Sequence, residues 1–266
     1  TFRNFAPQTR HSLAVNGGSE KVKFYISGDY SYQEPNYRNT VFNFQTAQLR
    51  SNVDAQITDN LKIGLDLATR KERRNNSVYS TGTMFWEAFM AYPYLYDYYP
   101  NGLPGPGLSN GNNLAVLASG KDTGYDRIDD FFVDSKINFE LKLPWITQGL
   151  SVSGYAAFDH HFYNRKQFWD VWDTYDYNDA TGDYVKKTTN MDGNKINLNQ
   201  TNDNNVSRTL HLKLNYERTF GDHRVGAFVA YEQNKYEGEN FWAWRGYYLS
   251  DKPDYLDFGA DKEKTN

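Results

Sequence analysis

The feature that most constrains this chain is a two-residue alternation of apolar and polar side chains, which recurs along much of its length. In the stretch VKFYISGDYSYQ, residues 22–33, every second position is apolar, small or aromatic, and the positions between are mostly polar. Such a period is typical of a β-strand whose two faces meet different surroundings. The same alternation predicts eight strands, at about 10–16, 22–33, 47–57, 61–70, 131–143, 150–163, 206–220 and 224–236.

The connections between these predicted strands alternate in length. Short turns that contain Gly, Asn, Asp or Pro fall at 17–20, 58–60, 144–149 and 221–223. Long polar and aromatic segments fall between the hairpins, at about 34–45, 72–129, 164–205 and 237–266. Loops this long are uncommon in compact soluble domains, whose connections have a median of about 4–6 residues. A strict alternation of short and long connections is typical of transmembrane β-barrels, with short periplasmic turns and long extracellular loops.

The two faces of the predicted strands favour a barrel over a soluble β-sandwich. The polar faces carry unlike charges close together, which suits a hydrated barrel interior; Arg50, Asp54, Lys136 and Glu140 are expected to face this lumen. The apolar faces gather aromatic residues near the strand ends, such as Tyr30, Tyr32, Phe162, Tyr231, Trp145 and Phe220. Two aromatic belts around an aliphatic band are typical of membrane barrels.

Composition excludes several other classes of protein. The chain has 266 residues and no stretch of 18 apolar residues, so a transmembrane helix is not expected, and the mean hydropathy of −0.81 does not argue against barrel strands. The net charge of −4 argues against a nucleic-acid partner. Cysteine is absent, which excludes disulfides and thiolate metal sites. The first residues, TFRNFAPQTR, do not form a signal peptide, so we expect a mature or internal segment.

Several motifs are shared with a known family. The segments HSLAVNGGSEKVKFYISGDYSYQE (11–34) and AQLRSNVDAQITDNLKIGLDLATRKE (47–72) contain the double glycine, the FYISGDY core, the Arg-x-Asn-x-Asp strand at 50–54 and the turn exit at 60–64. A further aromatic and proline segment ends at 100–102. On these residues the chain resembles the barrel of SusC-like TonB-dependent transporters of the Bacteroidetes outer membrane. Glu34-Pro35 departs from the family pattern, where a glycine would follow the acidic residue.

The resemblance implies a barrel of about 22 strands closed around a plug, which Arg50, Asp54, Lys136 and Glu140 would contact from the lumen side. The chain supplies about eight of them, and we expect residues 1–266 to form part of one barrel domain whose plug, TonB box and C-terminal strands lie outside it. The resemblance also implies a SusD-like surface lipoprotein over the outer mouth and energy from the TonB–ExbB–ExbD complex of the inner membrane. An eight-stranded barrel that closes on itself is the structural alternative.

No catalytic or metal-binding pattern stands out, so neither an enzyme nor a cofactor is predicted. His160 and His161 lie in a predicted strand and should point to opposite faces, which prevents them from holding one metal together. The segment 176–183 superficially resembles a calcium loop, but its Ala180 and Gly182 break the pattern. A hairpin turn inside a long loop is the favoured interpretation. The segment 202–205 is expected to be a solvated loop.

The aromatic residues of the long segments are the main functional candidates. Aromatic content is 17%, and sugar rings pack well on flat aromatic surfaces beside Asn, Asp and Arg. The candidate substrate-binding residues are Trp86, Tyr94, Tyr96, Trp169, Trp172, Trp242 and Trp244. The alternative is that these side chains pack the loops together or against a partner. The segment 84–96 also suggests a short amphipathic helix that Pro93 ends.

These features predict active import of an oligosaccharide or similar nutrient across the outer membrane. Peptide import by the same architecture is a second hypothesis. A non-transporting glycan-binding or adhesion protein and a soluble glycan-binding sandwich are two more.

Overall fold

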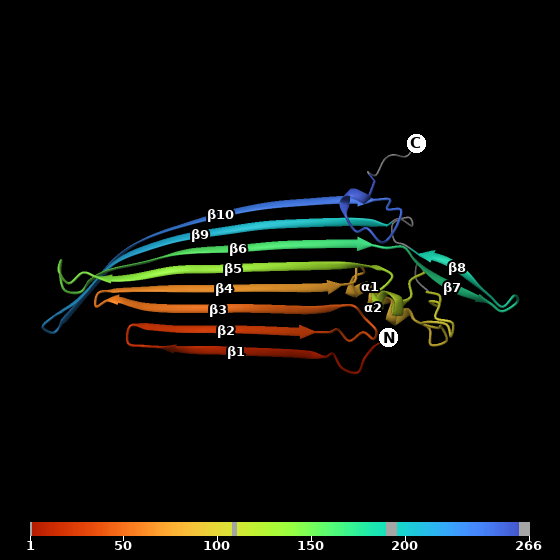
Figure 1. Ribbon diagram of the computed structural model, residues 1–266, viewed down its shortest axis with the longest axis horizontal. Coiled ribbons are helices and arrows are strands. Elements are labelled where there is room, and N and C mark those ends of the chain that lie inside the picture. The colour runs from red at the N-terminus through yellow and green to blue at the C-terminus, as the bar shows by residue number, and fades with distance from the viewer. Residues whose placement is uncertain (1, 108–110, 190–195, 261–266) are drawn as a thin grey trace.

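The computed structural model describes residues 2–107, 111–189 and 196–260. Its main element is one antiparallel sheet of eight strands in the order β1-β2-β3-β4-β5-β6-β9-β10. The strands lie side by side as a long, twisted wall, with β1 at one edge and β10 at the other (Figure 1). The bounds are β1 Gln8–Gly18, β2 Val22–Gln33, β3 Asn43–Thr58, β4 Leu61–Asn76, β5 Gly124–Lys142, β6 Leu150–Trp169, β9 Asn197–Phe220 and β10 His223–Gly246.

The all-β prediction is confirmed, and the eight predicted strands correspond to the eight strands of this sheet. The self-closing barrel is wrong for the chain as the structure describes it, because β1 pairs with no strand but β2, and β10 with no strand but β9. The sandwich alternative also fails within the described residues. The second sheet there is only the two-stranded hairpin of β7 (Trp172–Asn178) and β8 (Asp183–Thr189), so no partner sheet covers the side of the wall that carries the apolar side chains.

The strands are longer than predicted, and they lengthen across the wall. β1 has 11 residues and β10 has 24. The predicted strand near 206–220 begins at Asn197 instead, and the predicted strand near 131–143 begins at Gly124. Most of these added residues are polar, with Tyr125, Ile128 and Leu198 as exceptions, so the regular alternation of apolar and polar side chains disappears while the hydrogen-bonded ladder continues. The long connections are correspondingly shorter than their predicted bounds.

The short turns all lie at one end of the wall, which we call the short-turn end. They connect β1 to β2, β3 to β4, β5 to β6 and β9 to β10, as predicted. Gly149 shows why a turn residue is required there. Its φ is +86°, and a Cβ at this position would lie 2.1 Å from the carbonyl oxygen of Glu217. Only glycine tolerates both conditions without a shift of the backbone.

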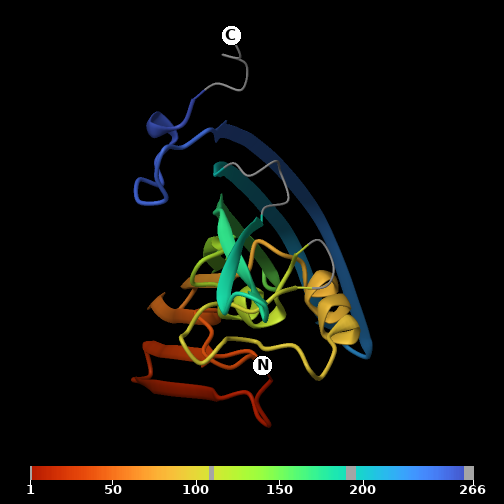
Figure 2. The same cartoon turned by 90° about the vertical axis from the view of Figure 1, so that its right-hand side faces the viewer.

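The long connections gather at the opposite end, which we call the mouth end (Figure 2). The β4–β5 connection contains α1 (Thr81–Met90) and α2 (Leu114–Ser119), and the β6–β9 connection contains the hairpin of β7 (Trp172–Asn178) and β8 (Asp183–Thr189). A 3₁₀ turn (Leu256–Phe258) follows β10. The predicted hairpin near 176–183 is confirmed. The predicted helix is displaced: α1 begins at the Ser80 cap and ends at Met90, before Pro93.

The mouth end has its own small core. Val116 and Leu117 of α2 are fully buried against Phe42, Tyr79, Met84 and Trp172. The side chain of Asn113 stabilises this core through two sets of hydrogen bonds. Its oxygen caps α2 by accepting from the backbone N–H groups of Ala115 and Val116, and its amide donates to the carbonyl oxygens of Asp97 and Gly105, at 2.8 and 3.0 Å. The described parts of the β4–β5 connection, 77–107 and 111–123, therefore form a packed cap on the end of the wall.

Candidate ligand-binding surface at the mouth end

The pairing register sorts the strand residues onto two faces of the wall. Residues opposite each other across an antiparallel ladder share a face, and neighbours along a strand alternate. One face carries Leu65, Val53 and Ile137 in a single cross-strand row. We call this the apolar face. The other carries Asn52, Asp66 and Lys136 in the adjacent row, and we call this the polar face.

The apolar face is exposed over its whole width. Its exposed large side chains include Leu13, Val15, Ile26, Leu49, Leu65, Leu67, Ile137, Phe158, Leu210, Leu212, Leu214, Val229 and Tyr231. On β5 this band runs from Leu141 to Phe131, about eleven residues, which matches the length of a strand that crosses a bilayer. A continuous exposed apolar surface of this size marks an interaction surface rather than ordinary solvent contact. Among the described residues, no helix is long and apolar enough to span a membrane.

The polar face holds a closed network of charged and aromatic side chains on β4, β5 and β6. Arg74 donates to Asp130 at 3.1 Å and to Glu72 at 2.7 Å, and Glu72 also pairs with Arg70 at 3.1 Å. Asp130 is buried and lies 2.8 Å from Nε2 of His161.

Phe132 completes this network from the centre. It lies between Arg70 and His161 in register. The Arg70 guanidinium carbon is 4.3 Å from its ring centroid, and the His161 ring stacks on it at 4.3 Å with an interplanar angle of 1°. Arg165 adds a bidentate pair with buried Asp126 nearby, at 2.8 and 2.7 Å. The opposed charges and the stacked rings hold this part of the wall in one arrangement.

The four residues predicted to face the lumen lie on the polar face. Asp54 pairs with Lys62 at 3.1 Å, and Lys136 pairs with Asp66 at 2.8 Å. Arg50 and Lys136 both line one recess of about 340 Å³, whose lining also contains Ala68 and Ala157. Glu140 lines a separate recess at the short-turn end. The four residues therefore share a face but do not form one site.

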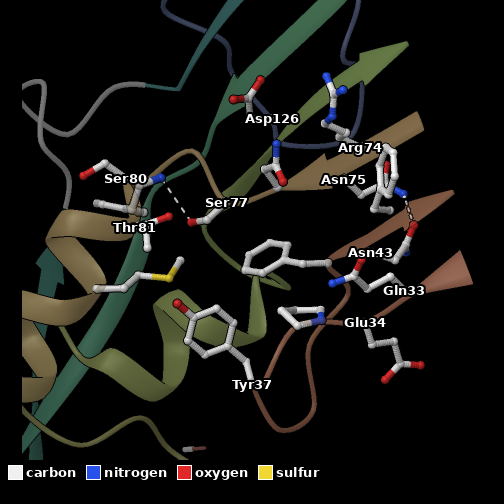
Figure 3. Close-up of a pocket in the computed structure, with 16 residues that line it drawn as sticks. Gln33, Glu34, Tyr37, Asn43, Arg74, Asn75, Ser77, Ser80, Thr81 and Asp126 are labelled. Carbon is white, nitrogen blue, oxygen red and sulfur yellow. Dashed lines mark hydrogen bonds between the residues drawn. The ribbon is translucent and has the colours of Figure 1, made fainter. Parts of the chain in front are cut away.

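A pocket of about 500 Å³ opens on the wall where the β2–β3 connection meets α1 (Figure 3). Arg74 and Asp126 lie on one side of it, Tyr37 on the opposite side, and Ser80 and Thr81 at the start of α1 on a third. Its lining also contains the side chains of Gln33, Glu34, Asn43, Phe44, Asn75, Asn76 and Met84. The lining thus offers amides, a guanidinium and hydroxyls beside aromatic rings, a combination suited to a polar ligand with apolar faces.

The aromatic candidates from the sequence occupy three different environments. Trp86, Tyr94 and Tyr96 are exposed in the β4–β5 connection, with Trp86 at 55% and Tyr94 at 73%. Trp172 is only 3% exposed, and its indole N–H donates to the hydroxyl of Tyr79 at 3.1 Å; Trp169 packs against the same core. As placed, these two side chains stabilise the loops, which was the alternative interpretation of the aromatic residues.

Trp242 and Trp244 lie in β10 and not in a loop, contrary to the predicted bounds of the last long segment. Both are on the polar face: Trp242 shares a row with Thr201 and Arg165, and Trp244 shares a row with Asn199. Trp242 is 65% exposed. The predicted candidates are thus divided between the exposed mouth-end connection, the loop core and the polar face of the wall.

A cluster of four tyrosines joins two connections, and sequence reasoning did not place these residues together. Tyr96 and Tyr99 of the β4–β5 connection lie 5.4 Å apart, Tyr99 meets Tyr184 of β8 edge-on at 4.9 Å, and Tyr184 lies 5.1 Å from Tyr177 of β7. The backbone N–H of Tyr177 also donates to the Tyr99 hydroxyl at 3.2 Å. The aromatic content of both segments was visible in the sequence, but nothing in it indicated that they meet.

The histidine prediction is confirmed: His160 lies opposite Val133 on the apolar face, and His161 opposite Phe132 on the polar face. Their functions in the wall also differ, because His160 contacts Asn204 while His161 joins the charged network. Within the described ranges, no group of three or more His, Asp or Glu side chains is arranged to hold a metal ion.

Glu87 of α1 is a carboxyl group that the sequence analysis did not single out. It is 5% exposed, and the Asn112 amide donates to it at 3.2 Å. Burial raises the pKa of Glu87, and the hydrogen bond from Asn112 opposes this only in part. Because the folded-state pKa is raised, the folded loop binds its proton more tightly, and stability falls as the pH rises through that pKa.

Glu87→Gln should therefore stabilise the β4–β5 connection at pH 7.5 by about 1 kcal/mol, the scale of one poorly satisfied buried polar group. The difference between variant and wild type should shrink at pH 4, where the wild-type carboxyl is protonated. Limited proteolysis of segment 77–123 at both pH values measures this. Glu20→Gln, at an exposed position of the short-turn end, is the control. An equal effect of Glu87→Gln at both pH values would contradict the assignment.

Comparison with known proteins gives a match in fold. No family model matches the chain, and no curated protein does. A chain in the structure of the RagAB peptide transporter matches with a TM-score of 0.69 and 18% identity over 98% of this chain. Chains of the RagAB peptide importer in its closed-closed and open-open states match with a TM-score of 0.68 and 17% identity, over 98% and 97% of this chain. The chain spans 27–28% of the length of these chains. At this identity the likeness establishes the fold of the wall.

Proposed function

We propose that this chain is part of the wall of an outer-membrane β-barrel that imports a nutrient, with energy supplied through the TonB–ExbB–ExbD complex. The observation that carries the proposal is the contrast between the two faces of one sheet. One face exposes an aliphatic band about as tall as a bilayer, and the other carries charge networks and polar recesses. The first face is assigned to lipid and the second to the lumen. Both the resemblance to SusC-like transporters and the fold likeness to a peptide importer support this assignment.

The length of the strands also supports a barrel wall that rises above the membrane. β9 has 24 residues, which corresponds to roughly 80 Å at about 3.3 Å per residue. A bilayer needs only about 9–11 residues of a tilted strand. The upper part of β9 carries Asn, Gln and Asp on both faces, as expected for wall that stands in water. The mouth-end connections then lie outside the cell, where a surface lipoprotein of the SusD type would cover them.

Two kinds of cargo are proposed, and different observations favour each. An oligosaccharide fits the amide-lined pocket and the exposed rings of Trp86, Tyr94, Tyr96 and Trp242, since sugars pack on aromatic faces and bind amides through hydroxyls. A peptide fits the paired charges of the polar face, because the charged termini and side chains of a peptide can replace one partner of such an ion pair. The fold likeness to a peptide importer supports the peptide.

Calorimetry on the full-length protein with its lipoprotein partner, against a panel of oligosaccharides and a panel of short peptides, distinguishes the two. Trp242→Ala should weaken binding of the true cargo class by about 0.5–1.5 kcal/mol, the scale of one aromatic contact. Trp145→Ala is the matched control, because Trp145 is equally exposed but lies at the short-turn end. Equal effects of the two substitutions would remove Trp242 from the cargo path. A protein that stays monodisperse without detergent would overturn the membrane location itself.

A further inference from the structure

A line of basic side chains follows the border of the aliphatic band that faces the mouth end, on the apolar face of the wall. On β4 the band ends at Thr69, and the next positions on that face are Lys71 and Arg73. On β5 the band ends at Phe131, and Asp129 and Arg127 follow. On β9 and β10 the band ends closer to the short-turn end, at Leu210 and Tyr231. The next basic residues on the apolar face of these strands, Arg208 and Lys235, are correspondingly closer to that end. We call Lys71, Arg73, Arg127, Arg208 and Lys235 the basic belt.

The belt is only partly neutralised by the carboxylates around it. Arg73 pairs with Asp129 at 2.6 Å, while Arg208 and Lys235 share Glu237. Within the described residues, Lys71 has no ion-pair partner, and Arg127 contacts only neutral groups, the amide oxygen of Asn75 at 3.3 Å and the ring of Tyr125. Lys71 and Arg127 are both exposed. The β4–β5 part of the belt therefore carries more positive than negative charge.

The position of these cations at the border of the aliphatic band indicates which groups they would contact. Lys71 lies directly opposite Phe131, the ring that ends the aliphatic band on β5. Its long apolar stem can lie along the band while its ammonium group reaches the next polar layer. In the proposed orientation that layer is the headgroup region of the outer leaflet, just beyond the hydrocarbon. Anionic lipid headgroups attract basic side chains at this depth.

We infer that the basic belt binds phosphate groups of outer-leaflet lipids through Lys71 and Arg127, which lie on either side of the Arg73–Asp129 pair, and that the acyl chains lie on the aliphatic band below. The site combines two features that are not found together on the polar face, unpaired cations and a continuous apolar surface beneath them. A phosphorylated lipid satisfies both at once, whereas a soluble anion satisfies only the cations. This inference rests on the proposed membrane location, which assigns the apolar face to lipid.

The test uses the full-length protein in detergent and native mass spectrometry with phosphatidic acid, diacylglycerol and inorganic phosphate. Phosphatidic acid and diacylglycerol differ only in the phosphate. Wild-type protein should retain phosphatidic acid in preference to diacylglycerol. The double variant Lys71→Gln/Arg127→Gln should retain phosphatidic acid about tenfold less, because each cation near a headgroup raises the affinity by a factor of about 3–5. Retention of diacylglycerol should not change.

The control is Lys23→Gln/Lys213→Gln, which removes the same charge from the polar face. It should leave lipid retention unchanged. Equal retention by wild type and the Lys71/Arg127 variant would overturn the inference, and so would binding of inorganic phosphate that depends on these residues without any preference for the lipid. If either of these contradicting results came from a protein that requires detergent, the lipid-binding inference would fail while the proposed function would stand. Solubility without detergent would instead overturn the membrane location and this inference together.

Discussion

Replacing Leu65 with arginine is expected to cost about 2–4 kcal/mol of folding free energy in a bilayer, the penalty for a charge on the lipid face of a barrel near the membrane midplane. Leu65 lies in the middle of the aliphatic band, with Val53 and Ile137 opposite it on the neighbouring strands. Its side chain is already 40% exposed. If this face met water, an arginine here would remain solvated and its cost would be small. The size of the penalty therefore reports what covers the apolar face.

Asn52→Arg is the matched control for this experiment. Asn52 precedes Val53 on β3 and lies on the polar face, where Asp66 is its neighbour across the ladder. An added guanidinium there faces a hydrated surface and a carboxylate, so we expect a change within about 0.5 kcal/mol. Reversible urea unfolding of the full-length protein in lipid vesicles measures both variants. Equal penalties for Leu65→Arg and Asn52→Arg would contradict the assignment of the two faces.

Trp172→Ala is expected to destabilise the core of the mouth-end connections by about 3–5 kcal/mol, the usual cost of removing a large buried ring. The side chain packs with Tyr79, Val116 and Leu117, and its removal also leaves the Tyr79 hydroxyl without the indole donor. The wall does not depend on this core, because its strands are held by their own ladders. The variant should therefore lose protection in the connections while the strands remain folded.

Hydrogen exchange followed by mass spectrometry separates the two regions. Segment 77–123 and the β7–β8 hairpin should exchange faster in Trp172→Ala, and β3 to β5 should not. Trp86→Ala is the control, since Trp86 is exposed and belongs to the same connection. The two tryptophans cannot be told apart in the sequence, so a difference in exchange would confirm their separate environments. Unchanged protection in Trp172→Ala would return this residue to the ligand-contact candidates.

The wall was predictable from sequence because the alternation of apolar and polar residues within each strand identifies the two faces of that strand. Ile26, for example, alternates with polar neighbours whatever the rest of the chain does. The upper parts of β9 and β10 were not predictable in this way. Asn202 and Asn204 look like part of a solvated loop because this segment is polar at almost every position, yet their backbone continues the ladder. Propensity describes the side chain, while the neighbouring strand decides the backbone conformation.

The candidate site was less predictable, because it depends on contacts between distant segments. The sequence indicated an aromatic-rich mouth end, but not which rings would be covered. Trp172 is buried because α2, more than fifty residues earlier in the chain, packs beside it. The His161–Phe132–Arg70 stack likewise requires the register of three strands. A single residue of slippage in any of them would send one member to the opposite face.

The unequal strand lengths limit how a barrel built on this wall can close. β1 offers 11 residues for pairing and β10 offers 24. A direct seam between them would leave more than half of the β10 edge with unpaired backbone groups, which sheets avoid. The strand beside β10 must therefore be about as tall as β10, and the strands beyond it must shorten again before they reach β1. The rim of such a barrel is a ramp rather than a level ring, and a lid resting on it would meet its high side first.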